Sequence, residues 1–276
     1  MRPIRLGLGA WPSAVPFAWP LQRGMIAWPG EIVVADAAEI DERMALGGFH
    51  IGLVSAATYL RHQADWVRSA QLALVASGPQ AQAAVLFSRH DLSLLDGTTF
   101  AVQPAAGGER ALLEALMRAE HALVISTVER RGPLEILLRD NPAALMVGER
   151  ALLTAQNLPD GVQAHDLTDL WHHATQMPFP VAVWVAKRTW REDHASEWAD
   201  AQRLISQARD MGLFMLEAVL ADWCSRRPIQ PEALGRHLAA YRYEVDATFL
   251  PALTRLAQLA GLPPPAENLG GTDVAV

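Results

Sequence analysis

Short apolar runs alternate with segments of helical spacing between residues 4 and 186, and this alternation most restricts the possible fold. The first set predicts strands at residues 4–9, 31–35 and 51–54. Between the second and third strands, residues 37–46 have the spacing of a helix, which stops at the helix-ending pair Gly47-Gly48. Strand, helix and strand in this order favour a mostly parallel sheet.

A second alternating set follows and predicts a separate α/β lobe. Its strands are expected at residues 100–103, 123–127 and 144–147, and its helices at residues 108–119 and 133–139. Because the two sets are separated along the chain, each is expected to build its own sheet.

The fold class predicted from these patterns is α/β with two lobes. We expect residues 1–88 to form the first part of one lobe and residues 89–180 to form the other. Residues 181–276 then return to the first lobe, with a strand followed by almost continuous helix from about residue 194 to 262. Strand ends and helix N-termini converge between such lobes, so a cleft that binds a small anion is predicted there.

Composition and charge exclude several classes of protein. A formal charge of −7 with no basic tract is unsuited to nucleic acid, whose phosphates need a basic face. No run reaches the roughly 18 uninterrupted apolar residues of a membrane-spanning helix, so no membrane partner is expected.

The apolar run 6–21 contains Pro12, Pro16 and Pro20, which would break the helical core of a secretory signal. Cys224 is the only cysteine, which fits a reducing, cytoplasmic location.

Two patterns resemble parts of known cofactor or metal sites. Gly7-Leu8-Gly9 is half of a dinucleotide-binding fingerprint, but Pro12 replaces its third glycine, so a plain tight turn is the alternative to a nicotinamide site. Asp166, Asp169 and the pair His172-His173 could place metal ligands on one helical face. The alternative there is an amphipathic surface helix, and we expect neither a metal nor an organic cofactor.

Polar and glycine positions beside strand ends are the candidate binding residues. Gly107-Gly108 opens a predicted helix with unpaired backbone N–H groups and lets a ligand approach closely, which would make an anion cradle. Glu109, in the first turn, is the alternative partner for the helix dipole. Ser13, Ser55 and Thr175 lie beside strand ends or turns, where each could bind a ligand or merely cap a helix or turn.

The longest motif runs from Asp166-Leu167 through Trp171 and Thr175-Gln176-Met177-Pro178-Phe179-Pro180 to Ala182-Val183-Trp184. It resembles the Asp-Leu, Trp and Thr-Gly-Leu-Pro-Phe pattern, leading into Ala-Val-Trp, of the menaquinone-biosynthesis family that acts on chorismate in the futalosine route. Upstream, Val147-Gly148-Glu149-Arg150-Ala151-Leu152 also falls in that family's order, and the similarity covers most of the chain.

This resemblance implies a periplasmic-binding-protein-like fold of type II, without a secretion signal and with a ligand cleft between its lobes. It also implies a carbon–oxygen lyase that removes water from the dicarboxylate chorismate to give 3-enolpyruvylbenzoate. The elimination makes the ring aromatic, so the protein mainly has to orient the dianion and help the hydroxyl leave. In the family the substrate's own enolpyruvyl carboxylate is thought to act as the base, and no cofactor is required.

Several polar positions depart from the family's pattern. Ser13 stands where the catalytic Asn is expected, and we assign it as the catalytic residue that orients the substrate or its leaving hydroxyl. Ala83 replaces a serine, and Gly107-Gly108 falls in a helix start that is rich in Ser and Thr in the family. Substrate binding is assigned to Gly107-Gly108, Ser55 and Thr175. The alternative function is a non-catalytic protein of the same fold that binds small organic anions, and no oligomeric state is predicted.

Overall fold

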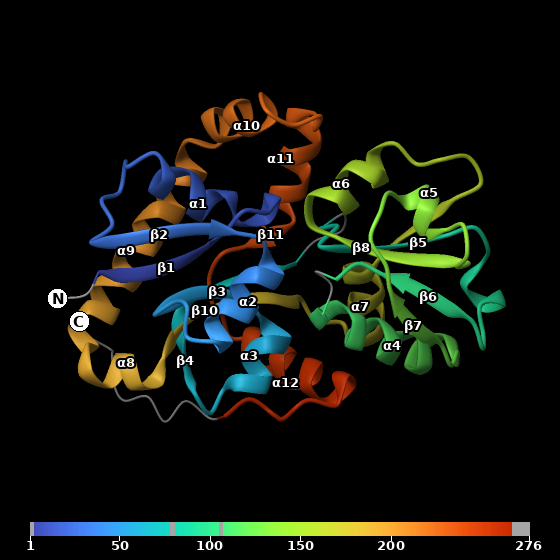
Figure 1. Ribbon diagram of the computed structural model, residues 1–276, viewed down its shortest axis with the longest axis horizontal. Helices are drawn as coiled ribbons and strands as arrows, with labels where there is room; N and C mark the ends of the chain where they lie inside the picture. The colour runs from blue at the N-terminus through green and yellow to red at the C-terminus, as the bar shows by residue number, and fades with distance from the viewer. Residues whose placement is uncertain (1–2, 78–80, 105–106, 267–276) are drawn as a thin grey trace.

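The computed structural model describes residues 3–77, 81–104 and 107–266, which form two α/β lobes, each built on its own sheet (Figure 1). In Figure 1 the sheet that contains the amino-terminal strands lies on the left, and the second sheet lies on the right. Helices flank both sheets, and the carboxyl-terminal helices return to the first lobe.

The first lobe contains a six-stranded sheet. Its strands are β1 (Ile4–Gly9), β2 (Gly30–Ala35), β3 (Ile51–Ser55), β4 (Trp66–Ala76), β10 (Phe179–Lys187) and β11 (Tyr241–Arg242). Their order across the sheet is β11-β4-β10-β3-β1-β2. Strand β1 runs parallel to β2 and β3, whereas β10 is antiparallel to both of its neighbours.

The second lobe contains a five-stranded sheet. Its strands are β5 (Ala84–Ser88), β6 (Thr99–Val102), β7 (Ser126–Glu129), β8 (Ala143–Val147) and β9 (Gln163–Asp166). Their order is β7-β6-β8-β5-β9, in which β6 runs parallel to β7 and β8, and β5 is antiparallel to β8 and β9.

Both sheets are therefore mixed, which corrects the expectation of a mostly parallel sheet. Ala182, near the start of β10, pairs with Ser55 at the end of β3. In the same way Ala84, at the start of β5, pairs with Val147 at the end of β8. A strand that arrives directly from the other lobe begins at the edge where the parallel strands end, so it must run in the opposite direction.

The expected lobe boundary after residue 88 also needs a correction. Strand β5 lies between β8 and β9 in the second sheet, so that boundary places residues 84–88 in the wrong lobe. Every residue of β5 is buried. An apolar run of this kind suits a central strand of either sheet, so its composition does not indicate which sheet it joins.

Helices cover the faces of the two sheets. Seven of them are α2 (Ala37–Ala45), α3 (Ala56–His62), α4 (Gly107–His121), α5 (Leu134–Leu137), α6 (Gly148–Gln156), α7 (Leu167–Thr175) and α8 (Arg188–Asp193). The carboxyl-terminal region contains α9 (Ala195–Phe214), α10 (Leu216–Cys224), α11 (Pro231–Ala239) and α12 (Phe249–Ala260). The expected continuous helix is interrupted where Pro228 and Pro231 lack backbone donors and where β11 joins β4.

The proline-containing segment after β1 is helical, contrary to the expectation that its prolines would break a helix. Helix α1 (Val15–Gln22) tolerates Pro16 in its first turn, where a missing N–H costs little. Pro20 lies inside the helix and cannot donate to the carbonyl of Pro16. Helix α9 approaches that carbonyl so closely that a Cβ on Gly212 would lie 2.1 Å from its oxygen.

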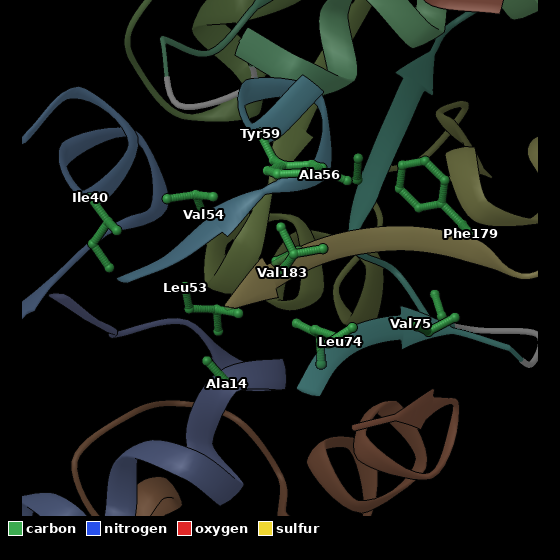
Figure 2. Close-up of a cluster of buried hydrophobic side chains, with 14 of the residues drawn as sticks. Ala14, Ile40, Leu53, Val54, Ala56, Tyr59, Leu74, Val75, Phe179 and Val183 are labelled. Carbon is green, nitrogen blue, oxygen red and sulfur yellow. The ribbon is translucent and has the colours of Figure 1, made fainter. Parts of the chain in front are cut away.

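The largest apolar core lies around the first sheet and continues into the second lobe. Leu53, Val183 and Leu74 come from the adjacent strands β3, β10 and β4 and are buried together (Figure 2). Phe100 on β6 extends the same cluster into the second lobe. Within the described residues, every helix is too short or too polar to cross a membrane.

The lobes also contact one another through helices. Leu152 on α6 packs in an apolar cluster with Trp19, Trp223 and Leu234, which come from α1, α10 and α11 of the first lobe. Beside this cluster, Arg227 donates a 2.9 Å hydrogen bond to the carboxylate of Glu149 on α6. On another side, α12 packs against both α3 and α4.

Candidate functional site

A cleft of 1290 Å³ lies between the two sheets, as expected from the lobed pattern. Its walls include residues at or just after the ends of five strands: Ala10, Asp36, Ser55, Gln103 and Gly148. In open α/β sheets the carboxyl ends of parallel strands form the ligand-binding edge. Both sheets turn that edge toward the same space, so one ligand can contact both lobes.

Ser13 reaches this cleft from a short 3-10 helix, η1 (Pro12–Ala14), that follows β1. Its side chain is buried, at 4% exposure, and lies beside Tyr241. Burial and the charge of Asp166 raise the pKa of Tyr241, whereas the Ser13 hydroxyl lowers it. Neither η1 nor α1 has a side-chain cap, so the capping interpretation of Ser13 has no support here.

Ser55 also lines the cleft, but its hydroxyl is committed to its own lobe. It caps α3 by accepting a 3.2 Å hydrogen bond from the amide of Thr58, and it donates a 2.6 Å bond to Asp41 on α2. The Asp41 carboxylate also accepts the Ser55 amide at 2.9 Å and the Thr58 hydroxyl at 2.6 Å. Burial nevertheless raises the pKa of Asp41. Ser55 therefore holds a half-buried carboxylate beside the cleft.

The Gly107-Gly108 pair lies where the two lobes meet. A Cβ on Gly108 would lie 3.1 Å from the Cβ of Ala57 and 3.5 Å from the hydroxyl of Ser55, so the glycine permits close contact with the first lobe. Gly107 begins α4, and residues 105–106 before it lie outside the described residues. Gly108 and Glu109 border a small recess, which Ser55 also lines.

Glu109 lines the main cleft as well as this recess. Burial raises the pKa of its carboxyl to about 7, and the charge of Asp41 acts in the same direction. The sequence interpretation considered Glu109 only as a partner for the helix dipole. Its position makes it an acidic group of the cleft that is partly protonated near neutral pH.

Thr175 does not lie in the cleft wall. Its hydroxyl donates a 2.8 Å bond to the Trp171 carbonyl and accepts a 3.2 Å bond from the Met177 amide at the end of α7. The next residue, Gln176, has a φ of 56°, in the region that favours glycine, and the resembling pattern carries Gly there. This part of the motif therefore builds the sharp turn into β10.

Asp166, the first residue of that motif, fixes a residue of the cleft. Its carboxylate accepts a 2.7 Å bond from the amide of Gln82 and a 2.9 Å bond from the amide of Thr168. Burial raises the pKa of Asp166 to about 6. Gln82, with a φ of 47°, lines the cleft together with Gln103, and both were missed by sequence reasoning. Only their places near predicted strand ends could have indicated them.

The half-fingerprint of glycines has a packing explanation. A Cβ on Gly7 would lie 2.8 Å from the ring of Phe49, and one on Gly9 would lie 2.7 Å from the ring of Trp11. Asp36, directly after the next strand, caps α2 by accepting a 2.9 Å bond from the Glu39 amide. These glycines therefore lie in strand β1 and make room for aromatic side chains, so they form neither a nicotinamide site nor the tight turn offered as its alternative.

The acidic and histidine residues near α7 do not converge on one point. Asp166 is bonded to backbone amides, His172 lies 3.4 Å from the Met177 carbonyl, and His173 lies 3.5 Å from Glu120. No group of three or more such side chains within the described ranges could hold a metal ion. The interpretation of this segment as an amphipathic surface helix therefore fits the structure.

Charged residues around the cleft are mixed. Arg131 and Arg150 lie on its second-lobe side and are exposed. Asp36, Glu39 and Glu42 lie on its first-lobe side. Glu109, Glu135 and Glu149 also lie on the second-lobe side, so each arginine can attract a carboxylate ligand only locally, and neither side of the cleft carries an excess of positive charge.

The protein has two α/β lobes, joined where the chain passes directly from a strand of one lobe to a strand of the other, and a cleft between them. This arrangement defines the class of periplasmic-binding-protein-like proteins, as the resemblance implied. A solved structure from Archaeoglobus fulgidus superposes with a TM-score of 0.75 at 18% identity, covering 94% of this chain and 96% of that one. The periplasmic aliphatic sulphonate binding protein of Escherichia coli superposes with a TM-score of 0.65 at 18% identity, covering 93% and 85%. At these identities the likeness concerns the fold alone.

Within this class, sequence comparison defines the family. Residues 4–261 match the family described as menaquinone biosynthesis, so the chain belongs to that family. A relative from Thermus thermophilus named chorismate dehydratase is 27% identical over 95% of this chain and 97% of its own length. The resemblance read from the Asp166 to Trp184 motif is thereby confirmed.

Proposed function

We propose that this protein is a chorismate dehydratase that forms 3-enolpyruvylbenzoate in the futalosine route of menaquinone biosynthesis. The observation that carries the proposal is the inter-lobe cleft with buried Ser13 in its wall, in a chain of this family. The name of the Thermus thermophilus relative supplies the substrate. The resemblance and the single cysteine support a cytoplasmic location.

In this reaction the ring loses its hydroxyl and the hydrogen of the neighbouring carbon. The substrate's enolpyruvyl carboxylate takes the proton, and the C–H electron pair becomes a ring double bond. The hydroxyl leaves with the C–O electron pair and becomes water when the carboxylate returns the proton to it. Ser13 donates a hydrogen bond to the departing oxygen, where negative charge develops. The buried position of Ser13 favours this role because water competes little there.

The cleft supplies several groups for the two carboxylates of the substrate. Gln82 and Gln103 offer amide donors, and Arg150 offers a charge-assisted donor at the mouth. The amides of Gly107-Gly108 remain proposed carboxylate ligands. Ser55 acts through its bonds to Asp41, and Thr175 acts by holding the turn before β10.

Incubation of the purified protein with chorismate tests the proposed function. We expect the diene absorbance to fall and mass spectrometry to detect the product at a mass lower by one water. The matched control is the same protein with the Ser13→Ala substitution, which keeps the fold and removes the proposed donor. Saturable binding of chorismate without turnover would instead favour the non-catalytic anion-binding alternative.

A further inference from the structure

His237 on α11 is a buried polar residue that the function described so far does not use. Its side chain is 4% exposed and forms part of the cleft wall. Among the described residues, neither of its ring nitrogens has a hydrogen-bond partner. The cleft wall therefore contains a polar side chain, more than nine-tenths buried, whose donor and acceptor both lack a partner in the part of the chain that the structure describes.

An unpaired buried imidazole lowers stability, because it gives up hydrogen bonds to water and gains none in return. Burial lowers the pKa of His237 to about 4, and the carbonyl of Ala81, which is close enough to favour the charged ring but outside the geometry of a hydrogen bond, acts in the opposite direction. That carbonyl already accepts a 2.9 Å bond from the hydroxyl of Tyr241. At neutral pH the ring is therefore uncharged, with one N–H to donate and one nitrogen to accept.

The position of His237 connects it to the proposed catalytic residue. Helix α11 packs against η1, which carries Ser13. The His237 ring lies 5.0 Å from the ring of Tyr241, and Tyr241 in turn lies beside Ser13. Both His237 and Ser13 line the same cleft. A ligand oxygen held by Ser13 is thus on the side of the cleft that His237 borders.

We propose that His237 is a substrate-binding residue, whose neutral ring hydrogen-bonds an oxygen of the substrate held next to Ser13. Both nitrogens are buried in the ligand-free protein, so this contact requires the ring to turn about its Cβ–Cγ bond, a torsion with a broad energy minimum, until one nitrogen faces the substrate. This inference rests on the proposed function, since chorismate supplies the oxygen.

The test compares His237→Leu and His237→Gln with the wild-type protein, using chorismate as the probe. Leu removes the unpaired polar atoms, so the ligand-free variant should melt about 2–4 °C higher. Its KM should rise about tenfold to a hundredfold with a smaller change in kcat, because a ground-state contact is lost. Gln restores a donor and an acceptor, so its KM should fall between those of the wild type and the Leu variant.

Tyr243→Phe is the matched control. The Tyr243 hydroxyl is also buried and has no partner within residues 3–77, 81–104 and 107–266, and its ring packs against Phe17. Removing that hydroxyl should raise the melting temperature without changing KM. A His237→Leu variant with wild-type KM overturns the inference, whatever its melting temperature. A wild-type protein that neither binds nor converts chorismate overturns the proposed function first, and this inference with it.

Discussion

Ser13 occupies the turn after β1 with a side chain shorter than the asparagine of the related pattern, and it is buried in the cleft. We expect Ser13→Ala to lower kcat by about tenfold to a thousandfold, the range for loss of a donor to the transition state. Because Ser13 caps neither η1 nor α1, the melting temperature should change little. Turnover and melting curves on one preparation check both expectations.

The exposed Ser225 provides the control for this measurement. Its hydroxyl donates a 2.8 Å bond to the Asp222 carbonyl at the end of α10 and lines no part of the cleft. Ser225→Ala should leave kcat unchanged. Normal kcat in Ser13→Ala, together with a clearly lower melting temperature, would contradict the catalytic assignment of Ser13.

Glu109 gives a pH-dependent prediction. Its pKa is raised to about 7 in the folded protein, above the ordinary value of 4.5, so folding favours the protonated form. The free energy of unfolding therefore falls as pH rises from about 4.5 to about 7. Glu109→Gln removes this pH-dependent loss of stability. It should therefore raise the free energy of unfolding by about 1–2 kcal/mol at pH 8, an amount that already allows for solvent screening of the partly exposed side chain. At pH 4 the substitution should have almost no effect.

Urea unfolding of the variant and the wild type at pH 4 and pH 8 measures the difference. Glu135→Gln is a suitable control, because Glu135 is an exposed carboxylate at the same cleft. It should shift the unfolding midpoint by no more than a small amount at either pH. A Glu109→Gln variant that is equally stabilised at both pH values would contradict the raised pKa as the cause.

At the scale of single residues, the sequence predicted some of the residues that line the cleft but not the hydrogen bonds that these residues form. Ser13 and Ser55 line the cleft because they stand at strand ends, which hydrophobic patterning locates well. Thr175 was predicted to bind substrate as a polar residue beside a turn, yet its hydrogen bonds lie within that turn. His237 lies far along the chain on an ordinary amphipathic helix, and only the three-dimensional structure shows that its ring nitrogens have no partner among the described residues.

Among the elements, the packing of α9 on α1 depends on one glycine. A Cβ at Gly212 would lie 2.1 Å from the carbonyl oxygen of Pro16, and both residues lie inside helices, whose backbones cannot easily move. We expect Gly212→Ala to force the helices apart and lower the free energy of unfolding by about 2–4 kcal/mol, as overpacking and a broken helix contact do. Thermal unfolding measures this loss.

Gly235→Ala is the matched control for that substitution. Gly235 also lies inside a helix, α11, but a Cβ there would meet only the side chain of Leu220, at 3.6 Å. Alanine suits a helix better than glycine, so this variant should gain up to about 1 kcal/mol. A specific role for Gly212 would be contradicted if Gly235→Ala also lowered the free energy of unfolding, or if Gly212→Ala left that free energy unchanged.

The elements themselves were predicted to different degrees. Apolar patterning located β1 and α2 closely, because buried faces and helix caps leave local signals. It failed for α1, where prolines argue against a helix but tertiary packing with α9 stabilises one. It also failed for strand direction, which depends on the edge of the sheet at which β5 and β10 enter.

For the whole molecule, helix contacts limit how freely the lobes can move about the cleft. Leu152 is buried against the first lobe, and its truncation should remove about 2–5 kcal/mol of packing. We expect saturating chorismate to reduce the radius of gyration of the wild type slightly. In Leu152→Ala the ligand-free lobes should separate further, so the reduction should be larger.

Small-angle X-ray scattering with and without chorismate measures this difference. Leu158→Ala, which truncates an exposed leucine of the same lobe, should behave like the wild type. Identical scattering of the wild type and Leu152→Ala, in both states, would contradict a role for this contact in lobe movement.

Strand β10 also constrains the order in which the chain can fold during synthesis. It lies between β3 and β4, so Val54 and Ala73 both pair with Val183, which leaves the ribosome only after the whole second sheet. Until then β3 and β4 each have an edge without its native partner, and such edges promote aggregation. The second lobe, whose strands all lie between residues 84 and 166, can close its own sheet first. The first lobe is therefore the slow and vulnerable step of biogenesis, although it contains the amino terminus.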